Sequence, residues 1–329
     1  MDIINGPKVV VIGGGTGQSI FLRGLKQLTE NITAVVAVTD DGGGSGKLRE
    51  DLGMLPPGDI RNCIIALADI EPEMKKVMQY RFPEGAFKGQ SFGNLFIAAL
   101  NGVYGSFEKA ITKISQILAV KGRVLPVSLD NLRLYAELEN GSLVKGEAHI
   151  PQESIKQKSR IKRVFLDTQE PQALYEVVEA ISCADIIVIG PGSLYTSIIP
   201  NILIPQIKDA ILQSKALKVY VCNIMTQPGE TDGFDVLEHV EAIFSHSCPG
   251  LFEYVIANSG CIPSELVEKY EHDAASVVQI DKRREMILDE KNVKVITGDF
   301  VEVKKGYIRH DAYRLASLII DLFQGVKSR

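Results

Sequence analysis

The sequence predicts an α/β fold whose core is a mostly parallel, doubly wound sheet. Short β-branched runs recur along the chain and are bounded by Gly, Asn or Asp, as strands covered on both faces require. Amphipathic helical patterns separate several of these runs, and this alternation is typical of the fold class. The 329 residues are 45% hydrophobic and 23% charged, an ordinary composition for a globular protein. We expect one domain over residues 1–329.

The apolar runs define the strands that we expect in this sheet. They cover residues 8–12, 33–38, 185–189, 218–223, 254–257 and 276–280. Apolar stripes at helical spacing within residues 21–28 and 174–181 predict helices after the first strand and before the third. Residues 312–323 predict a closing amphipathic helix that packs on the sheet.

Two segments interrupt the alternation of strand and helix. Residues from about 56 to 120 carry helical patterns with little strand signal and predict a helical insertion. Residues from about 131 to 150 alternate apolar and polar side chains around Asn140-Gly141, which predicts an antiparallel hairpin at the edge of the sheet. The charged stretch 156–163 is most simply a solvated linker or face.

Charge and cysteine content restrict the partners and the compartment. A net charge of -5 and a pI of about 5.7 give no general attraction to nucleic acid or to an anionic membrane. The five cysteines are widely spaced without a Cys-x-x-Cys pair, which indicates reduced thiols in a cytosolic protein. No signal-peptide pattern opens the chain, and no apolar run reaches the ~18 residues of a membrane span. We expect a cytoplasmic homo-oligomer that binds a small molecule.

The first glycine-rich loop follows the first predicted strand and precedes a helix. Gly14, Gly15, Thr16 and Gly17 stand where backbone N–H groups and the positive end of a helix bind phosphate. The loop is an imperfect dinucleotide fingerprint because Gln18 stands where a small residue packs helix against strand. A tight turn without a ligand is the simpler alternative.

The second glycine-rich loop begins with two adjacent carboxylates, Asp40 and Asp41. Hard divalent ions prefer such oxygen ligands, so a Mg²⁺ site is one interpretation and solvated side chains are the other. In a nicotinamide enzyme, Asp40 is also placed to hold a ribose hydroxyl.

Two further helix starts carry polar residues. Asp59 is explained by capping its own helix, with Arg61 and Asn62 in the first turn. A cation at a positive helix end is unfavourable unless an anion is near, so Arg61 is a candidate ligand contact. Asn94 repeats this arrangement at another helix. Ordinary surface roles are equally compatible with both residues.

Two later loops follow predicted strands. Gly192, Ser193, Thr196 and Ser197 offer N–H and hydroxyl groups at a helix start, which suits a phosphate or a plain cap. The loop after the next strand brings Asn223 and Thr226, whose polar groups suit a base or a sugar. Loops at the ends of parallel strands converge, so we expect one shared site.

The histidines show no ligand spacing, and no Gly-x-Ser-x-Gly elbow supports nucleophilic hydrolysis. His310 is of interest because its neighbour Arg309 is suited to pair with a phosphate. A carboxylate partner is the alternative for Arg309.

Five ordered motifs together resemble one family. They read VIGGGTG (11–17), VTDDGG (38–43), LPPGDIRNC (55–63), GPGSLYTSIIPN (190–201) and NIMTQPGET (223–231). The chain resembles the bacterial YvcK-type gluconeogenesis factors, within the larger CofD-like superfamily. The resemblance spans at least residues 8–257.

The resemblance implies a Rossmann-like three-layer fold and a role in cell shape and wall-precursor supply during gluconeogenic growth. Members of this branch bind UDP-sugars, notably UDP-N-acetylglucosamine, and the resemblance places Tyr270 and Arg309 among the sugar-nucleotide contacts. The CofD relatives are Mg²⁺-dependent 2-phospho-lactate transferases acting on a deazaflavin. Their Asp-Asp motif lies in the active site and corresponds to Asp40 and Asp41.

Our leading hypothesis is therefore a regulatory or metabolic protein that binds a nucleotide-sugar, without a tightly bound organic cofactor. The first alternative is a transferase of a phospho-lactyl or related group that uses Mg²⁺ at Asp40 and Asp41. The second alternative is a dehydrogenase that binds a dinucleotide at the first loop.

Overall fold

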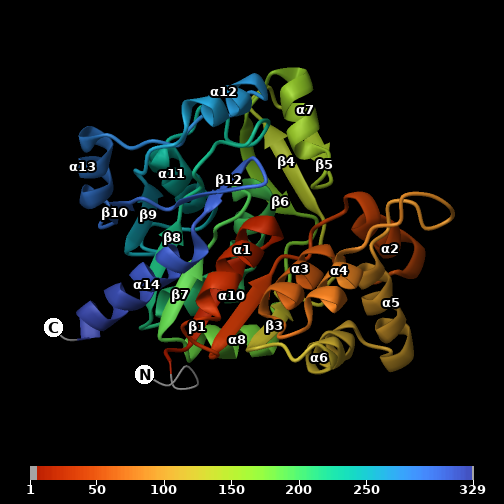
Figure 1. Ribbon diagram of the computed structural model, residues 1–329. Helices are drawn as coiled ribbons and strands as arrows, with labels where there is room; N and C mark the ends of the chain where they lie inside the picture. The colour runs from red at the N-terminus through yellow and green to blue at the C-terminus, as the bar shows by residue number, and fades with distance from the viewer. Residues whose placement is uncertain (1–5, 328–329) are drawn as a thin grey trace.

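The central element is a seven-stranded parallel sheet with the order β10-β9-β8-β7-β1-β2-β3 (Figure 1). The computed structural model describes residues 6–327. The strands are β1 (Val9–Gly13), β2 (Ile32–Val36), β3 (Arg123–Pro126), β7 (Ile186–Ile189), β8 (Leu217–Val221), β9 (Tyr254–Asn258) and β10 (Lys294–Gly298). β1, β2, β7 and β8 are buried along their whole length, as near-continuous apolar strands require in a sheet covered on both faces.

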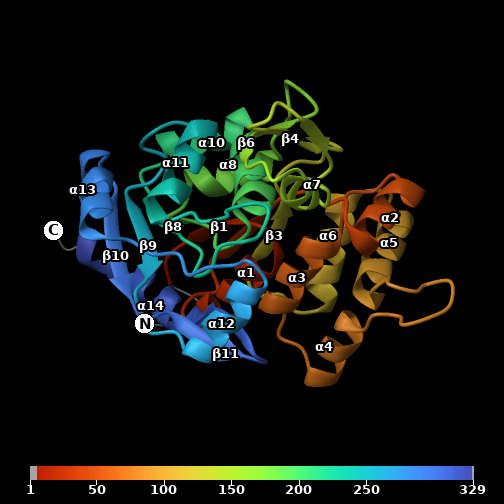
Figure 2. The same cartoon turned by 90° about the horizontal axis from the view of Figure 1, so that it is seen from above.

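Helices cover both faces of this sheet and make three layers (Figure 2). One layer contains α1 (Gly15–Leu25), α3 (Gly58–Leu67) and α14 (Ala312–Lys327), with α1 packed between the other two. The opposite layer contains α8 (Tyr175–Ser182), α9 (Ile199–Ile202), α10 (Pro205–Gln213) and α11 (Val236–His246). The predicted doubly wound α/β fold is therefore confirmed.

The predicted helical insertion is also confirmed. Four helices occupy this segment and follow α2 (Gly43–Leu52): α3, α4 (Pro72–Gln79), α5 (Phe92–Tyr104) and α6 (Phe107–Ile117). α5 and α6 begin with serine caps, because Ser91 and Ser106 accept hydrogen bonds from the third helical N–H group of each helix.

The predicted hairpin forms, but it lies in a separate sheet. β4 (Leu134–Leu138) pairs antiparallel with β5 (Leu143–Lys145) on one side and β6 (Ile161–Leu166) on the other, so the hairpin is not an edge of the central sheet. The charged stretch 156–163 forms a solvated face, one of the two roles expected for it, and is not a linker. These residues end α7 (Ile150–Gln157) and begin β6, whose Lys162 and Arg163 form ion pairs with Glu137.

The prediction of a sheet strand over residues 276–280 is wrong. Val277 forms only an isolated antiparallel bridge with Met225, and Thr226 N donates to Ser276 O at 2.7 Å. The sheet instead ends at β10, which follows α12 (Ser264–His272) and α13 (Lys282–Glu290). A two-stranded hairpin, β11 (Val301–Lys304) and β12 (Tyr307–His310), then leads into α14.

No helix within residues 6–327 combines the length and the apolar character needed to span a membrane.

Candidate functional site

The sheet changes direction between β1 and β7. From β1 the chain moves to β2 and β3 on one side, and it later returns to lay β7 against the other side of β1. The loops after β1 and β7 therefore diverge above the sheet, which is where ligands bind in folds of this class. The helical insertion and the small antiparallel sheet lie between β2 and β7 in the chain, yet β1 and β7 remain neighbours in the central sheet.

A cavity of about 410 Å³, which we call the glycine-loop cavity, lies at this point. It is lined by segments that follow β1, β7 and β8, together with α12 and β12. Its residues are Gly14, Gly15, Thr16, Gly17, Ile20, Pro191, Gly192, Ser193, Asn223, Ile224, Met225, Thr226, Gln227, Pro228, Tyr270, Asp273, Ala275, Ile308, Arg309 and His310. Ten of the residues expected to bind a ligand are among them: Gly14 to Gly17, Gly192, Ser193, Asn223, Thr226, Tyr270 and Arg309.

Close approach of two loops explains one of the glycines. A Cβ atom on Gly17 would lie 2.8 Å from the carbonyl oxygen of Pro191, so any side chain there would push α1 away from the loop after β7. The first N–H groups of α1 have no carbonyl partner within the helix, and this amino end of α1 lines the glycine-loop cavity. This wall is therefore built from backbone that a ligand can approach closely.

Gln18 shows how the imperfect fingerprint works. Its side chain is fully buried, and its amide donates at 2.9 Å to the carbonyl oxygens of Val11 in β1 and Val35 in β2. The Sγ of Cys63 in α3 donates to the side-chain oxygen of Gln18, Oε1, at 3.4 Å. The larger residue thus joins two strands and a helix, in place of the tight contact that a small residue gives.

The loop after β8 is held by the segment that we expected to be a strand. Thr226 Oγ1 accepts from Ser276 N at 2.8 Å, and Thr226 N donates to Ser276 O. Thr226 is thereby fixed at the cavity wall. Gln227, which sequence reasoning missed, also lines the cavity and donates to Glu230 at 2.7 Å.

Arg309 is the cationic side chain of this cavity, whose lining also includes the carboxylate of Asp273. Its guanidinium lies 5.2 Å from the centre of the Tyr307 ring and donates to Ile308 O at 3.2 Å. Within residues 6–327 it forms no ion pair, so the carboxylate partner considered from the sequence is not present there. Tyr270 accepts a hydrogen bond from Ile308 N at 3.1 Å and so fixes the strand that carries Arg309.

His310 is a buried neutral group beside Arg309. Burial lowers the pKa of His310 to about 4. Its Nε2 lies 3.2 Å from the carbonyl oxygen of Cys222 at the end of β8, so this nitrogen is the donor. The contact ties β12 to the central sheet.

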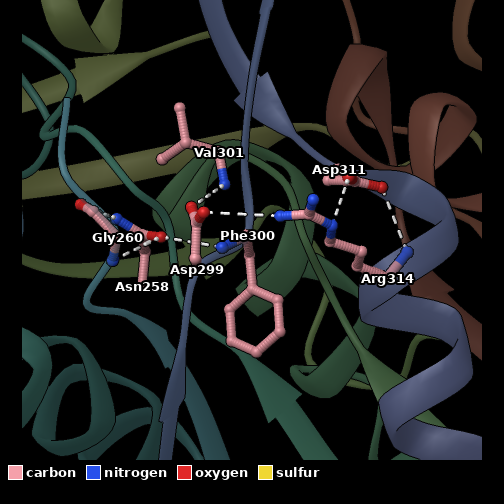
Figure 3. A network of polar contacts seen from close by, with 7 residues as sticks. All are labelled: Asn258, Gly260, Asp299, Phe300, Val301, Asp311 and Arg314. Carbon is pink, nitrogen blue, oxygen red and sulfur yellow. Dashed lines mark hydrogen bonds and ion pairs between the residues drawn. The ribbon is translucent and has the colours of Figure 1, made fainter. Parts of the chain in front are cut away.

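A polar network beside His310, at the same open end of the hairpin, completes its attachment (Figure 3). Asn258 at the end of β9 accepts hydrogen bonds from Phe300 N at 3.0 Å and Gly260 N at 3.2 Å. Arg314 in α14 bridges two carboxylates, those of Asp299 and Asp311, each at 3.3 Å. β11 and β12 are thus held between β9 and α14, so the strand that carries Arg309 is fixed in place.

A second cavity of about 340 Å³, which we call the acidic cavity, adjoins the first. It is lined by Gly15, Thr16, Asp40, Asp59, Glu147, Ala148, Pro151, Ser193, Thr196, Ser197, Gln227 and Glu230. Besides Gly15, Thr16 and Ser193, which line both cavities, three further expected ligand residues lie here, namely Asp40, Thr196 and Ser197. The other three carboxyl groups come from separate segments without a shared motif, so sequence reasoning did not find them as a group.

These four carboxyl groups are poorly solvated. Burial and the neighbouring Asp40 raise the pKa of Asp59 to about 6. Burial raises the pKa of Glu230 to about 7, and burial together with Asp40 raises that of Glu147 well above its ordinary range. The pKa of Asp40 is also raised, chiefly by burial. Carboxyl groups in such surroundings favour a proton or a cation over a phosphate as a neighbour.

Two of these carboxyl groups occupy helix ends that we expected to bind phosphate. Asp59 accepts from Gly15 N at 2.6 Å, so it caps α1 and does not cap its own helix as the sequence suggested. Glu230 accepts from Tyr195 N at 3.3 Å and from Thr196 Oγ1 at 3.1 Å, at the start of the π-helical turn η2 (Leu194–Ile198). The protein's own side chains thus satisfy the donors on the acidic side.

The remaining expected residues line neither cavity. Arg61, Asn62 and Asn94 gather behind the acidic cavity, where Arg61 donates to Asn62 at 2.9 Å, to Asn94 at 2.8 Å and to Ser91. This cluster joins the start of α3 to the start of α5. Asp41 lines neither cavity and accepts from Ala148 N at 2.9 Å.

The adjacent aspartates do not form a preorganised metal cage. Asp40 accepts from Gly42 N at 2.9 Å and is the only member of the pair that lines the acidic cavity. Over the part of the chain that the structure describes, no group of three or more His, Cys, Asp or Glu side chains is arranged to hold a metal ion. A Mg²⁺ ion at Asp40 would need ligand phosphate oxygens and water, which is a common arrangement for this ion.

Comparison with known proteins identifies the family. The model of the family "2-phospho-L-lactate transferase CofD" matches residues 9–301. The chain belongs to the CofD family. A putative gluconeogenesis factor from Thermoanaerobacterium thermosulfurigenes is 55% identical over 321 residues, which cover 98% of each chain. The gluconeogenesis factor of Bacillus subtilis is 44% identical and covers 97% of this chain and 98% of its own.

Solved structures support the same assignment within the CofD family. Protein BH3568 from Bacillus halodurans has a TM-score of 0.91 and 42% sequence identity, covering 96% of this chain and 100% of its own. The identity is high enough for the likeness to reflect common descent as well as a shared fold. The predicted resemblance to the gluconeogenesis factors of this family is confirmed.

Proposed function

We propose that this CofD-family protein binds a nucleotide-sugar, UDP-N-acetylglucosamine, in the glycine-loop cavity. The observation that carries the proposal is the position of Arg309, a cation without a carboxylate partner among the described residues, in a cavity that also contains the amino end of α1. A guanidinium and a helix amino end both favour phosphate. The cavity volume of about 410 Å³ lies within the range of small-molecule sites.

The rest of the lining suits the base and the sugar. Asn223, Thr226 and Gln227 follow β8 and offer amide and hydroxyl groups, and Tyr270 adds an aromatic ring. Amides read the polar edge of a base, and hydroxyls and amides pair with sugar hydroxyls. We assign the diphosphate to the wall made by Gly14 to Gly17 and Gly192, opposite these residues.

We further propose a regulatory or metabolic role for the bound form. The relatives named gluconeogenesis factors support a function in gluconeogenic growth, and we extend it to cell shape and wall-precursor supply. The protein would act in the cytoplasm as a homo-oligomer, without a tightly bound organic cofactor.

Isothermal titration calorimetry tests the binding proposal. UDP-N-acetylglucosamine should bind with micromolar or tighter affinity, and Arg309→Ala should weaken it about tenfold or more, because it removes a charge-assisted contact to phosphate. Arg283→Ala, on the exposed face of α13, is the matched control and should leave the affinity unchanged. UDP should retain much of the affinity and N-acetylglucosamine little. Absence of heat at millimolar ligand would reject the proposal.

A Mg²⁺-dependent transferase is the second candidate, favoured by the acidic cavity next to the ligand cavity and by the family's name. The residues that would hold the ion are Asp40, supported by Asp41, and the chemistry supplied is neutralisation of charge on a transferred phosphorus-containing group. Turnover of a nucleotide-diphosphate donor should disappear with EDTA and in Asp40→Asn. No turnover with any donor in the presence of Mg²⁺ would count against this activity.

The dehydrogenase alternative receives less support. Asp40 lines the acidic cavity and is absent from the lining of the glycine-loop cavity, where a dinucleotide ribose would need it.

A further inference from the structure

A third cavity of about 560 Å³ lies on the far side of the β11–β12 hairpin, and we call it the hairpin cavity. It is bounded by one face of α1, the end of α4, the hairpin and the first turn of α14. Its lining residues are Ile20, Arg23, Gly24, Gln27, Gln79, Glu302, Lys304, Lys305, Tyr307, Arg309, Asp311, Ala312 and Tyr313. Ile20 and Arg309 belong to this cavity and to the glycine-loop cavity.

The charges of the hairpin cavity are not balanced. Four cationic side chains line it against two carboxylates. Glu302 already pairs with Lys304 at 3.3 Å, and Asp311 pairs with Arg314 at 3.3 Å. Within residues 6–327, Arg23, Lys305 and Arg309 form no ion pair. The cavity therefore carries a positive charge that the protein's own carboxylates do not neutralise.

Arg23 shows most directly that a partner is missing. Its Nε is buried and has no hydrogen-bond partner, which is costly for a charged donor. Lys75 approaches from α4, where burial, then Arg23 and Lys304, lower its pKa. An anion in the cavity would relieve this repulsion and give Arg23 an acceptor.

We propose that the hairpin cavity is a second binding site, specific for a phosphorylated small molecule and coupled to the glycine-loop cavity through Arg309. Phosphate fits the forked donors of Arg23 and Arg309 and the ammonium groups of the two lysines. The exposed ring of Tyr313 offers a surface for an attached base or sugar. The volume and the enclosure by four elements suit a small molecule.

The coupling follows from the shared arginine. One guanidinium cannot serve two phosphates fully, so an anion that draws Arg309 toward the hairpin cavity weakens binding in the glycine-loop cavity, and the reverse must also hold. The coupling rests on the proposed nucleotide-sugar function, whereas the existence of the second site does not.

Calorimetric titration with inorganic pyrophosphate, without metal, tests the site itself. We expect a class of binding that Arg23→Gln and Lys304→Gln each weaken about tenfold, and that Gly192→Ala, which adds a methyl group to the proposed diphosphate wall of the glycine-loop cavity, leaves within twofold. Arg283→Gln on α13 is the control for loss of one positive charge. Lys304 is largely exposed, so its variant keeps the test valid if Arg23→Gln unfolds, as a thermal melt would reveal.

Two results would overturn the second site. One is pyrophosphate binding that is absent in the wild type or unaffected by Arg23→Gln and Lys304→Gln. The other is an equal loss of nucleotide-sugar affinity in Arg23→Gln when no pyrophosphate is present, because the hairpin cavity would then hold one end of the first ligand.

The coupling has its own measurement. Saturating pyrophosphate should weaken UDP-N-acetylglucosamine binding several-fold in the wild type and have no effect in Arg23→Gln. If the nucleotide-sugar does not bind at all, the proposed function fails while the pyrophosphate titration still decides the second site. If it binds and pyrophosphate never alters its affinity, the two sites are independent and the coupling is wrong.

Discussion

The glycine-loop cavity and the acidic cavity share part of their backbone lining and differ in the ionisable side chains that face them. Both are lined by Gly15, Thr16, Ser193 and Gln227. Arg309 lines the first. The second is lined by four carboxyl groups whose pKa values are raised by burial. Loop shape alone therefore does not fix the electrostatics of a site, because side chains from distant segments bring different ionisable groups to each side.

The helix ends make this difference concrete. Asp59 takes the N–H of Gly15 and Glu230 takes that of Tyr195, so donors on the acidic side are already satisfied within the protein. Gly15 lines both cavities, whereas Arg309 lines the glycine-loop cavity and not the acidic one. Four variants separate the roles of the two cavities, from the largest expected effect to the smallest.

Gly17→Ala should damage the shared wall most. Its Cβ would lie 2.8 Å from Pro191 O, so α1 and the loop after β7 must separate, and we expect a loss of about 2–3 kcal/mol in the free energy of unfolding and of nucleotide-sugar binding. Gly102→Ala in α5 is the control. The Cβ atom that this substitution adds would have no atom within 4 Å. The variant should therefore be neutral or stabilising by up to about 1 kcal/mol in the free energy of unfolding, measured by urea denaturation. Equal effects of the two substitutions would show that the wall is not closely packed.

Asp59→Asn should change how stability depends on pH. The folded-state pKa of about 6 lies above the ordinary 3.8, so the folded protein binds the proton more tightly. This stabilisation is present at low pH and is lost as pH rises through about 6. Relative to wild type, the asparagine variant should gain about 1.5 kcal/mol between pH 5 and pH 8. Asp209→Asn changes an exposed residue of α10 and should show no such gain in stability. An identical pH profile for both variants would refute the account of Asp59.

Asp41→Ala should separate the two adjacent aspartates. It removes the acceptor of Ala148 N, so we expect unfolding to become easier by about 1 kcal/mol while nucleotide-sugar affinity stays within twofold. Asp40→Ala, which changes the acidic cavity, is the comparison. A greater loss of ligand affinity in Asp41→Ala than in Asp40→Ala would contradict the observed orientation of the pair.

Tyr270→Phe should have the smallest effect, on the glycine-loop side. It leaves Ile308 N without its acceptor, and we expect a loss of about 0.5 kcal/mol in unfolding free energy and a few-fold weaker binding through Arg309. Calorimetry and thermal melts measure the two effects. A loss of affinity as large as that of Arg309→Ala would mean that the hydroxyl contacts the ligand directly.

The sequence predicts the part of the fold whose signals are local. Five of the seven parallel strands are apolar runs of the expected kind, and the helical insertion and the hairpin turn at Asn140-Gly141 have clear patterns. The β-branched run at 276–280 has the pattern of a sheet strand, but it packs against the loop 224–226 as an isolated bridge. β3 and β10 were missed because short edge strands with exposed or charged positions lack a continuous apolar signal.

The site divides in the same way. Glycine loops and strand ends located Gly14 to Gly17, Ser193 and Asn223, because parallel strands bring such loops together. Nothing local relates Asp59, Glu147 and Glu230, because they come from the start of α3, the segment between β5 and α7, and the loop after β8. Arg61 shows the limit of reasoning from local pattern. Its charge lies at a helix start, but its guanidinium donates hydrogen bonds to Ser91 and Asn94 outside both cavities.

The most direct test of the central claim is a crystal structure with UDP-N-acetylglucosamine bound. We expect the diphosphate beside the amino end of α1 and Gly192, within hydrogen-bonding distance of Arg309, and the acidic cavity free of phosphate. A diphosphate seated among Asp40, Asp59 and Glu230, or a ligand that does not touch Arg309, would contradict the account.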